Sequence, residues 1–259
     1  MFPSFTAIIP ARMGSTRFPG KALADIAGLP MVVHCALRAR DSGAARVVVA
    51  TDHEKIATAV LSAGLEVVIT RTDHETGTDR LAEAADLLGL SAEEIVVNVQ
   101  GDEPLMVPDV IRRVAERLAT STACAMATAC YPIHDRAHFE STSAVKVVLN
   151  RDGEALYFSR APIPWPRDAF AEKASSWPGA LPAWHHVGLY AYRVAFLEAF
   201  TGLSRSPLET FEALEQLRAL WHGYRIAVVT TDRAPAPGVD TPEDLERVRA
   251  LFDHRPVSG

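Results

Sequence analysis

The sequence predicts an α/β protein with a doubly wound, mainly parallel sheet and a small mixed β/α lobe. Short apolar runs alternate with amphipathic helical patterns along the first half of the chain, which is typical of a parallel sheet. These runs are continuously apolar, as expected for strands covered on both faces. After about residue 140 the strands become mixed in polarity. With 259 residues and 48% hydrophobic content, we expect one domain over residues 1–259.

The first half contains the elements of the parallel sheet. Predicted strands cover residues 5–9, 46–51, 66–70, 94–100 and 123–129. Predicted helices cover residues 30–43, 52–64, 78–90 and 108–119. Gly43 and Gly64 are placed to end the first two helices, and Asp52 is placed to cap the second.

The second half predicts the small lobe and the end of the sheet. Residues 144–150 and 185–193 are predicted strands, and the Pro- and Trp-rich segment 160–184 between them is a predicted long loop. Helical patterns at 197–200 and 207–223, a strand at 225–230 and a last helix at 241–252 follow. Thr241 and Asp244 resemble a capping box at the start of that helix.

Composition and charge exclude several classes of protein. The formal net charge is −6 and the pI is about 5.8, which disfavours a nucleic-acid-binding protein. No run approaches the roughly 18 apolar residues that span a bilayer, and the N-terminus does not resemble a signal peptide. Three cysteines without a CxxC motif favour reduced thiols. We therefore expect a cytoplasmic protein that binds neither nucleic acid nor membrane.

A basic loop follows the first predicted strand. Arg12, Arg17 and Lys21 lie within residues 11–21, which contain no acidic residue. In open α/β sheets, ligands bind outside the carboxyl ends of the strands, where this loop begins. The loop also contains Gly14, Ser15, Thr16 and Gly20. Glycines, main-chain N–H groups and cations together favour a phosphate cradle over a merely solvated basic loop.

Two familiar phosphate-binding motifs do not fit this loop. Gly14 and Gly20 enclose one residue too many for a P-loop, and Ala22 stands where a magnesium-binding hydroxyl is needed. The dinucleotide fingerprint G-x-G-x-x-G is absent as well. Neither an ATPase of the P-loop type nor a Rossmann dehydrogenase is therefore supported.

Carboxylates at a second strand end predict a metal site. Asp102 and Glu103 follow the predicted strand that ends near Gln100, so they reach the sheet edge where the basic loop begins. A hard divalent cation is usually held by one or two carboxylates together with phosphate oxygens and water. Asp240 is a second candidate ligand. The alternatives are that Asp102 and Glu103 are turn residues and that Asp240 is a helix cap.

Several motifs together resemble one family over residues 5–252. The stretches IIPARMGSTRFPGKAL, TDHETGTDRLAEA, VVNVQGDEP, YFSRAPIPW, HVGLYAYR and GVDTPEDLERV are similar to those of 3-deoxy-manno-octulosonate cytidylyltransferases. The resemblance implies a nucleotide-diphospho-sugar transferase-like fold. It also implies transfer of CMP from CTP to 3-deoxy-D-manno-octulosonate (Kdo) with Mg²⁺, releasing pyrophosphate, for lipopolysaccharide synthesis. A homodimer, with the small lobe at its interface, is implied by the same analogy.

The resemblance also implies roles for individual residues. Catalytic roles fall to Arg17, Lys21 and Asp102, and Mg²⁺ binding falls to Asp102 and Asp240. Implied CTP-binding residues are Arg12, Gly14, Ser15, Thr16, Arg17, Lys21, Arg71, Thr78 and Arg80. Implied Kdo-binding residues are Gln100, Arg160, His186, Tyr190, Glu215 and Gln216.

Some departures and alternatives accompany this assignment. The family often has alanine at the position of Gly14, an aromatic residue at Met13 and glutamate at Asp79, but none of these changes removes a needed charge. His186 and Tyr190 fit a packed core as well as a sugar pocket. Lys146 is either an outward strand residue or a helper at the phosphates. Another acidic sugar, a non-catalytic nucleotide sensor and a purely structural interaction protein are the competing functions.

Overall fold

The structure is a computed structural model that describes residues 3–14, 18–171, 177–232 and 234–253. The main sheet has the strand order β11-β7-β10-β6-β1-β4-β5, and β8 and β9 extend it from β10. The strands of the main sheet are β1 (Thr6–Ala11), β4 (Arg46–Thr51), β5 (Glu66–Ile69), β6 (Ile95–Asn98), β7 (Met126–Pro132), β8 (Lys146–Leu149), β9 (Ala155–Ser159), β10 (Trp184–Arg193) and β11 (Ile226–Thr230). A small hairpin consists of β2 (Asp25–Ile26) and β3 (Leu29–Pro30).

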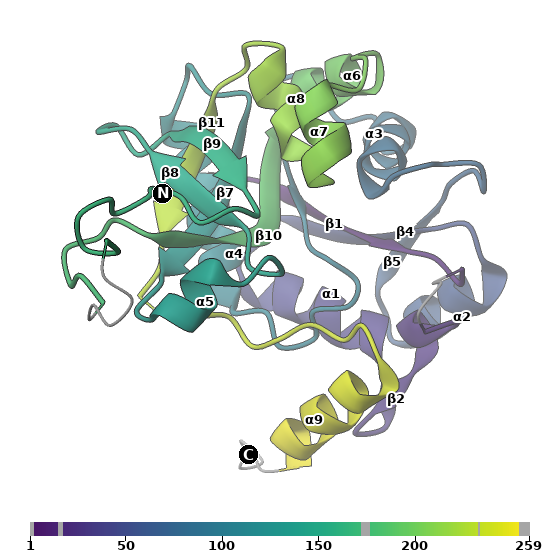
Figure 1. The fold of residues 1–259 in the computed structure, drawn as a ribbon. Helices are drawn as coiled ribbons and strands as arrows, with labels where there is room; N and C mark the ends of the chain where they lie inside the picture. Colours follow the sequence, from purple (N-terminus) through teal and green to yellow (C-terminus); the bar gives the residue numbers. More distant parts are fainter. Residues whose placement is uncertain (1–2, 15–17, 172–176, 233, 254–259) are drawn as a thin grey trace.

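Helices cover both faces of this sheet (Figure 1). One face carries α1 (Met31–Asp41), α2 (Glu54–Ser62), α4 (Pro108–Thr120) and α9 (Pro242–Asp253), and the other carries α3 (Gly77–Leu87), α6 (Val194–Thr201), α7 (Pro207–Glu212) and α8 (Gln216–Trp221). Successive strand residues point to opposite faces, so Ile9 packs in the first core and Ile8 in the second. Because both faces of the sheet are covered, strands such as β1 carry apolar side chains on both faces, as predicted.

The predicted mainly parallel sheet is confirmed, with one antiparallel insertion. β1 runs parallel to β4 and β6, and β7 runs parallel to β11. β10 runs antiparallel to β6, β7 and β8 and joins the two halves of the sheet. No local sequence pattern shows that β10 will pair with strands far from it in the sequence, because the order of strands in a sheet depends on the whole fold.

Two local predictions were wrong. The predicted helix 207–223 is broken at Ala213, which has φ 51°, and across the break the buried Arg218 of α8 pairs with Glu209 of α7 (Nη2–Oε1 2.5 Å). Asp52 does not cap α2; His53 does so, through Nδ1, which accepts the Lys55 N–H at 3.2 Å. The Asp52 carboxylate instead accepts from Arg80 at 2.7 Å.

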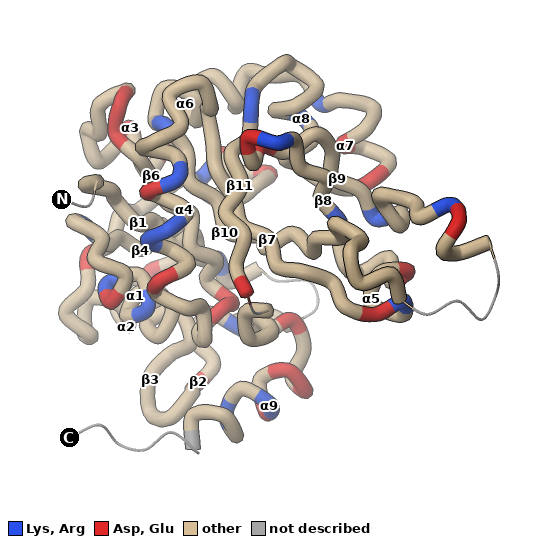
Figure 2. Tube along the Cα trace, turned by 90° about the vertical axis from the view of Figure 1, so that its left-hand side faces the viewer, with Lys and Arg blue, Asp and Glu red and all other residues tan. Residues whose placement is uncertain are grey.

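The small lobe consists of β8, β9, α5 (Arg136–Glu140) and the described parts of loop 160–183. A third apolar cluster holds it together, with Phe139 5.5 Å from Trp177 between ring centroids. At the other end of the molecule, α9 packs beside the β2–β3 hairpin, and Arg249 donates to the Asp25 carbonyl at 2.7 Å (Figure 2). The predicted capping box of α9 is present, since the Asp244 N–H donates to Thr241 Oγ1 at 3.2 Å.

Lys146 of β8 serves neither of the two roles that the sequence left open. Its side chain is fully buried, and Nζ donates to the carbonyls of Ala144 (2.6 Å), Arg160 (2.6 Å) and Ser141 (2.8 Å). All three ammonium donors are therefore used. The contact fastens the start of β8 to the end of β9.

Lys146→Met should lower the free energy of unfolding by about 2–4 kcal/mol, because three carbonyl groups lose their donor. Urea denaturation followed by circular dichroism measures the change. Lys55→Met, at an exposed position of α2, is the control and should stay within about 0.5 kcal/mol of the unchanged protein. Equal stability of the two variants would contradict a fastening role for Lys146.

Candidate functional site

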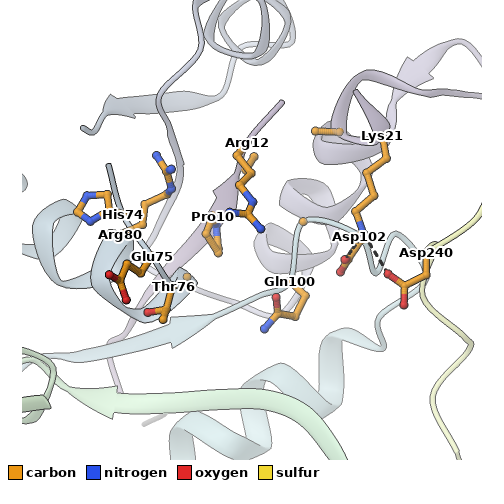
Figure 3. Close-up of a pocket in the computed structure, with 14 residues that line it drawn as sticks. Pro10, Arg12, Lys21, His74, Glu75, Thr76, Arg80, Gln100, Asp102 and Asp240 are labelled. Atoms are coloured by element: carbon orange, nitrogen blue, oxygen red, sulfur yellow. Dashed lines mark hydrogen bonds and ion pairs between the residues drawn. The ribbon is translucent and has the colours of Figure 1, made fainter. Parts of the chain in front are cut away.

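The order of the strands creates a crevice between β1 and β6. From β1 the chain continues to β4 and β5 on one side and returns to β6 on the other. Ligands of open α/β sheets bind at such a switch point, outside the carboxyl ends of the strands. A cavity of about 350 Å³ lies there (Figure 3). It is lined by Pro10, Ala11, Arg12, Lys21, Ala22, His74, Glu75, Thr76, Gly77, Arg80, Gln100, Gly101, Asp102 and Asp240.

Two glycines give this crevice its shape. A Cβ atom on Gly101 would lie 2.8 Å from the Pro10 carbonyl oxygen, so only glycine lets the turn after β6 approach the end of β1 this closely. Gly20 has φ 73° and precedes the short helix η1 (Lys21–Leu23). That left-handed turn brings Lys21 back over the cavity.

The predicted phosphate loop contributes two described cations to the cavity. Arg12 points into it, and no described residue lies within hydrogen-bonding distance of its guanidinium (Figure 3). Lys21 lines the cavity on the side of Asp102 and Asp240. Gly14 is exposed and does not line the cavity. Ser15, Thr16 and Arg17 lie outside the described residues, so their predicted roles remain predictions.

Lys21 connects the two predicted metal ligands. Its Nζ lies 2.6 Å from Asp102 Oδ2 and 3.2 Å from Asp240 Oδ1, and it donates to the Val239 carbonyl at 3.1 Å. The two carboxylates come from segments far apart in the sequence. They converge at this edge because the Val239 N–H donates to the Asp102 carbonyl at 2.8 Å.

The donor set fits a hard divalent cation. Mg²⁺ is commonly bound by one or two carboxylates, with phosphate and water oxygens completing its coordination. Asp102 and Asp240 supply those two carboxylates, and the Lys21 ammonium takes the position between them that a cation would share. Among the described residues, no three Asp, Glu, His or Cys side chains form a metal-binding group, so substrate oxygens would have to supply further ligands.

Glu103 adds a third carboxylate behind this pair. Burial, and then repulsion from Asp102 and Asp240, raises the pKa of Glu103 to about 7. Its Oε2 atom is buried and has no hydrogen-bond partner among the described residues. The sequence placed Glu103 beside Asp102 at the sheet edge, with a turn role as the alternative, but nothing in the local pattern showed that its side chain would be buried.

The wall opposite Lys21 comes from α3 and the segment before it. Arg80 is buried there, donating to Asp52 Oδ2 at 2.7 Å and to Thr70 Oγ1. His74 and Thr76 also line the cavity, although sequence reasoning did not select them. Thr76 forms a capping box with Asp79, and that T-x-x-D spacing was the available signal.

Two residues predicted to bind CTP lie away from the cavity lining. The Arg71 side chain is exposed and pairs with Asp73 at 3.2 Å. Thr78 is buried on α3 and donates to Glu215 Oε2 at 2.7 Å. Thr78, predicted to bind CTP, is therefore hydrogen-bonded to Glu215, one of the residues predicted to bind Kdo.

Several of the predicted sugar residues lie beside β10, next to the cavity. Gln100 lines the cavity and donates to the Gly188 carbonyl of β10 at 3.4 Å. Glu215 Oε1 and Gln216 Nε2, beside β10, are buried without a described partner, and burial raises the pKa of Glu215. Unsatisfied buried polar atoms are costly, so their presence favours a ligand-binding role.

Arg160 is held by hydrogen bonds to backbone carbonyls, whereas His186 and Tyr190 of β10 contact each other through their rings. Arg160 stands at the end of β9, where it donates to the carbonyls of Glu212 (2.8 Å) and Thr142 (3.1 Å). His186 and Tyr190 of β10 lie with their ring centroids 5.4 Å apart and their ring planes tilted by 46°. Burial lowers the pKa of His186 to about 3, so this imidazole is neutral at pH 7.

The switch-point crevice, its cations and its paired carboxylates define a nucleotide-binding enzyme that handles a polyphosphate. A sequence profile of the cytidylyltransferase family matches residues 6–226, and the chain belongs to that family. It is similar to the solved structure of a CMP:2-keto-3-deoxy-manno-octonic acid synthetase complexed with CTP. The identity is 43%, the match covers 97% of this chain and 99% of that one, and the TM-score is 0.87.

A second solved structure shares the fold at much lower sequence identity. A cytidylyltransferase from Leptospira borgpetersenii serovar Hardjo-bovis (strain JB197) matches with 17% identity and a TM-score of 0.63. The match covers 99% of this chain and 89% of that one, and it supports the fold alone. The resemblance inferred from the motifs is confirmed by the family match and by the first of these structures.

Lys21→Met should raise the affinity of the nucleotide-free protein for Mn²⁺ by at least about tenfold, because the competing ammonium between two carboxylates is removed. Mn²⁺ binding is followed by electron paramagnetic resonance of the free ion. Arg12→Met removes a charge from the same cavity without touching either carboxylate, so its effect should be much smaller. Unchanged or weaker Mn²⁺ binding by Lys21→Met would argue against a shared cation position.

Proposed function

We propose that this protein transfers CMP from CTP to Kdo, giving CMP-Kdo and pyrophosphate for lipopolysaccharide synthesis. The main support is the convergence of Lys21, Asp102 and Asp240 at the switch point beside Arg12. The CTP-bound synthetase that is 43% identical over nearly the whole chain supports the choice of nucleotide and sugar. Membership of the cytidylyltransferase family gives the type of reaction.

The reaction needs positioning and charge stabilisation more than covalent chemistry by the protein. The anomeric hydroxyl of Kdo loses its proton and bonds to the α-phosphorus of CTP, while the bond from that phosphorus to the pyrophosphate oxygen breaks. Arg12 and Lys21 would hold the phosphates and balance the charge that develops on pyrophosphate. Arg17, at the same loop, is assigned this role by resemblance.

Asp102 and Asp240 would hold Mg²⁺ near the α-phosphate. The bound cation supplies Lewis-acid stabilisation of the charge on the phosphoryl oxygens. Lys21 would leave the carboxylates and turn to the phosphates when both substrates are bound. Its contacts with the two carboxylates, at 2.6 Å and 3.2 Å, make that exchange a short movement of one flexible side chain.

Kdo would be held by the polar region beside β10. The negative charge of its carboxylate requires a cation, and Arg160 is the proposed partner. Glu215 and Gln216 carry buried unsatisfied atoms suited to sugar hydroxyl groups. Thr78 would position Glu215 through their 2.7 Å hydrogen bond.

The three cysteines fit a reducing compartment. Cys35, Cys124 and Cys130 are all buried and free. None of the described helices combines the length and apolar character that a bilayer crossing requires. We expect the enzyme to work in the cytoplasm, where free thiols persist.

Pyrophosphate release with Mg²⁺ tests the proposed activity. CTP, UTP and ATP are each paired with Kdo, 8-amino-Kdo and sialic acid, and release is expected with CTP and Kdo alone. Release with a different acidic sugar would change the proposed sugar substrate and leave the proposed nucleotide-binding role unchanged. Protein that binds CTP but releases pyrophosphate with no sugar would overturn the proposed activity.

Asp102→Asn should lower kcat by at least about 100-fold while circular dichroism stays unchanged, because the neutral amide binds Mg²⁺ weakly. Asp109→Asn, an exposed carboxylate at the start of α4, is the matched control and should turn over normally. Near-normal turnover by Asp102→Asn would refute the metal-binding role.

We also propose a homodimer that buries exposed apolar side chains of α7 and of β9 in the small lobe. Phe211 at the end of α7 is 91% exposed, and Leu156 of β9 is 59% exposed. The next residue along α7, Glu212, accepts from Ser159 Oγ of β9 at 2.5 Å, so these two elements are fastened together. An exposed patch of large apolar side chains typically marks an interface.

Phe211→Asp should convert the dimer to a monomer, since a carboxylate at the centre of the interface is costly to bury. Size-exclusion chromatography with light scattering gives the mass. Leu61→Asp is the control, because Leu61 of α2 is 60% exposed and lies outside the proposed face. A monomeric unchanged protein, or a Phe211→Asp dimer, would rule out this surface.

A further inference from the structure

β10 contains an irregularity beside the predicted sugar residues. Val187 pairs with Ala129 of β7, but the next paired residue, Tyr190, lies opposite Thr128. Two residues of β10 are therefore looped out of the ladder between them. In a regular strand, residues four apart are separated by about 13 Å. The bulge shortens that separation, which lets the rings of His186 and Tyr190 approach to 5.4 Å.

The Thr128 hydroxyl lies at the centre of this bulge. Thr128 is fully buried, and its Oγ1 atom is 2.8 Å from the Leu189 carbonyl and 3.0 Å from the Val187 carbonyl. The same oxygen is 3.0 Å from His186 Nε2. Three polar partners thus surround one hydroxyl group.

The chemistry of these partners favours one arrangement of the protons. Carbonyl oxygens accept hydrogen bonds and cannot donate them, so two carbonyls within 3.0 Å favour directing the single Thr128 hydroxyl proton to one of them. The oxygen of that hydroxyl is then free to accept a hydrogen bond from the Nε2–H of His186. A neutral imidazole carries one proton, so Nδ1 of His186 is left as an acceptor.

The bulge also borders the cavity. Gly188, one of its two unpaired residues, accepts from Gln100 Nε2 at 3.4 Å, and Gln100 lines the nucleotide cavity. Gly188 lines a second hollow together with Asp102 and Asp240. His186 is therefore held only two residues from a backbone segment that faces the site, and no described residue donates to its Nδ1.

We propose that Thr128 is a positioning residue that holds His186 in the Nε2–H tautomer, so that Nδ1 accepts a hydrogen bond from a hydroxyl group of the sugar. The inference rests on the proposed function and makes it more specific. His186 recognises a hydroxyl group and does not donate to the carboxylate, which is left to a cation such as Arg160. A sugar derivative that lacks this hydroxyl group is bound more weakly.

Thr128→Val keeps the shape of the side chain and removes its hydroxyl group. The KM for Kdo should rise about tenfold, while the KM for CTP should stay within about twofold, because one interaction with the sugar is lost. Thr128→Ser keeps the hydroxyl group and should restore the KM for Kdo. Thr231→Val is the matched control, since it removes another buried hydroxyl group of this region, one bonded to the Cys130 carbonyl at 3.3 Å.

Nitrogen chemical shifts of ¹⁵N-histidine-labelled protein give a readout that packing alone would not move. The unchanged protein should show His186 protonated at Nε2 and bare at Nδ1, with the signal assigned by its loss in His186→Gln. Thr128→Val should lose this fixed tautomer, and Thr128→Ser should keep it.

Two results would overturn the inference. One is a His186 signal protonated at Nδ1 in the unchanged protein, which requires no variant to fold. The other is a Thr128→Val enzyme with an unchanged KM for Kdo. If the unchanged protein turned over no sugar, the proposed function would fail, and the tautomer measurement would still decide whether Thr128 fixes His186.

Discussion

Repulsion between two aspartates is the constraint on which the site depends. Asp102 and Asp240 are brought to one sheet edge by elements more than a hundred residues apart, and two carboxylates at such close quarters require a cation. Lys21 meets that requirement in the substrate-free protein. The turn at Gly20, the close approach of Gly101 to Pro10 and the hydrogen bond from Val239 to Asp102 all serve to hold this arrangement.

Helix α3 links the two halves of the site. Arg80 faces the nucleotide cavity from this helix, whereas Thr78, two residues earlier, reaches Glu215 in the predicted sugar region. Both side chains are buried and hydrogen-bonded, so neither can move without disturbing α3. Under the proposed assignment, one helix would help to place both substrates, which suits a reaction that depends on alignment.

Local patterns in the sequence were enough to predict the parallel strands, the basic loop and the carboxylate edge. They could not predict the antiparallel insertion of β10, which depends on contacts between distant segments. They also missed the break at Ala213, because alanine favours a helix and the Arg218–Glu209 pair across the break is a tertiary contact. Asp52 illustrates the same limit within the site. Its position favours a cap, but a distant arginine takes its carboxylate, and no local spacing encodes that pairing.

β10 has a mechanical consequence for the molecule. Its first residues pair with β8 in the small lobe, and its last residues pair with β6 in the main sheet. One strand is therefore shared by both parts, and bending between them would disturb its backbone pairing on either side of the two residues that are looped out. The residues of β10 therefore form a wall that the main sheet and the small lobe have in common.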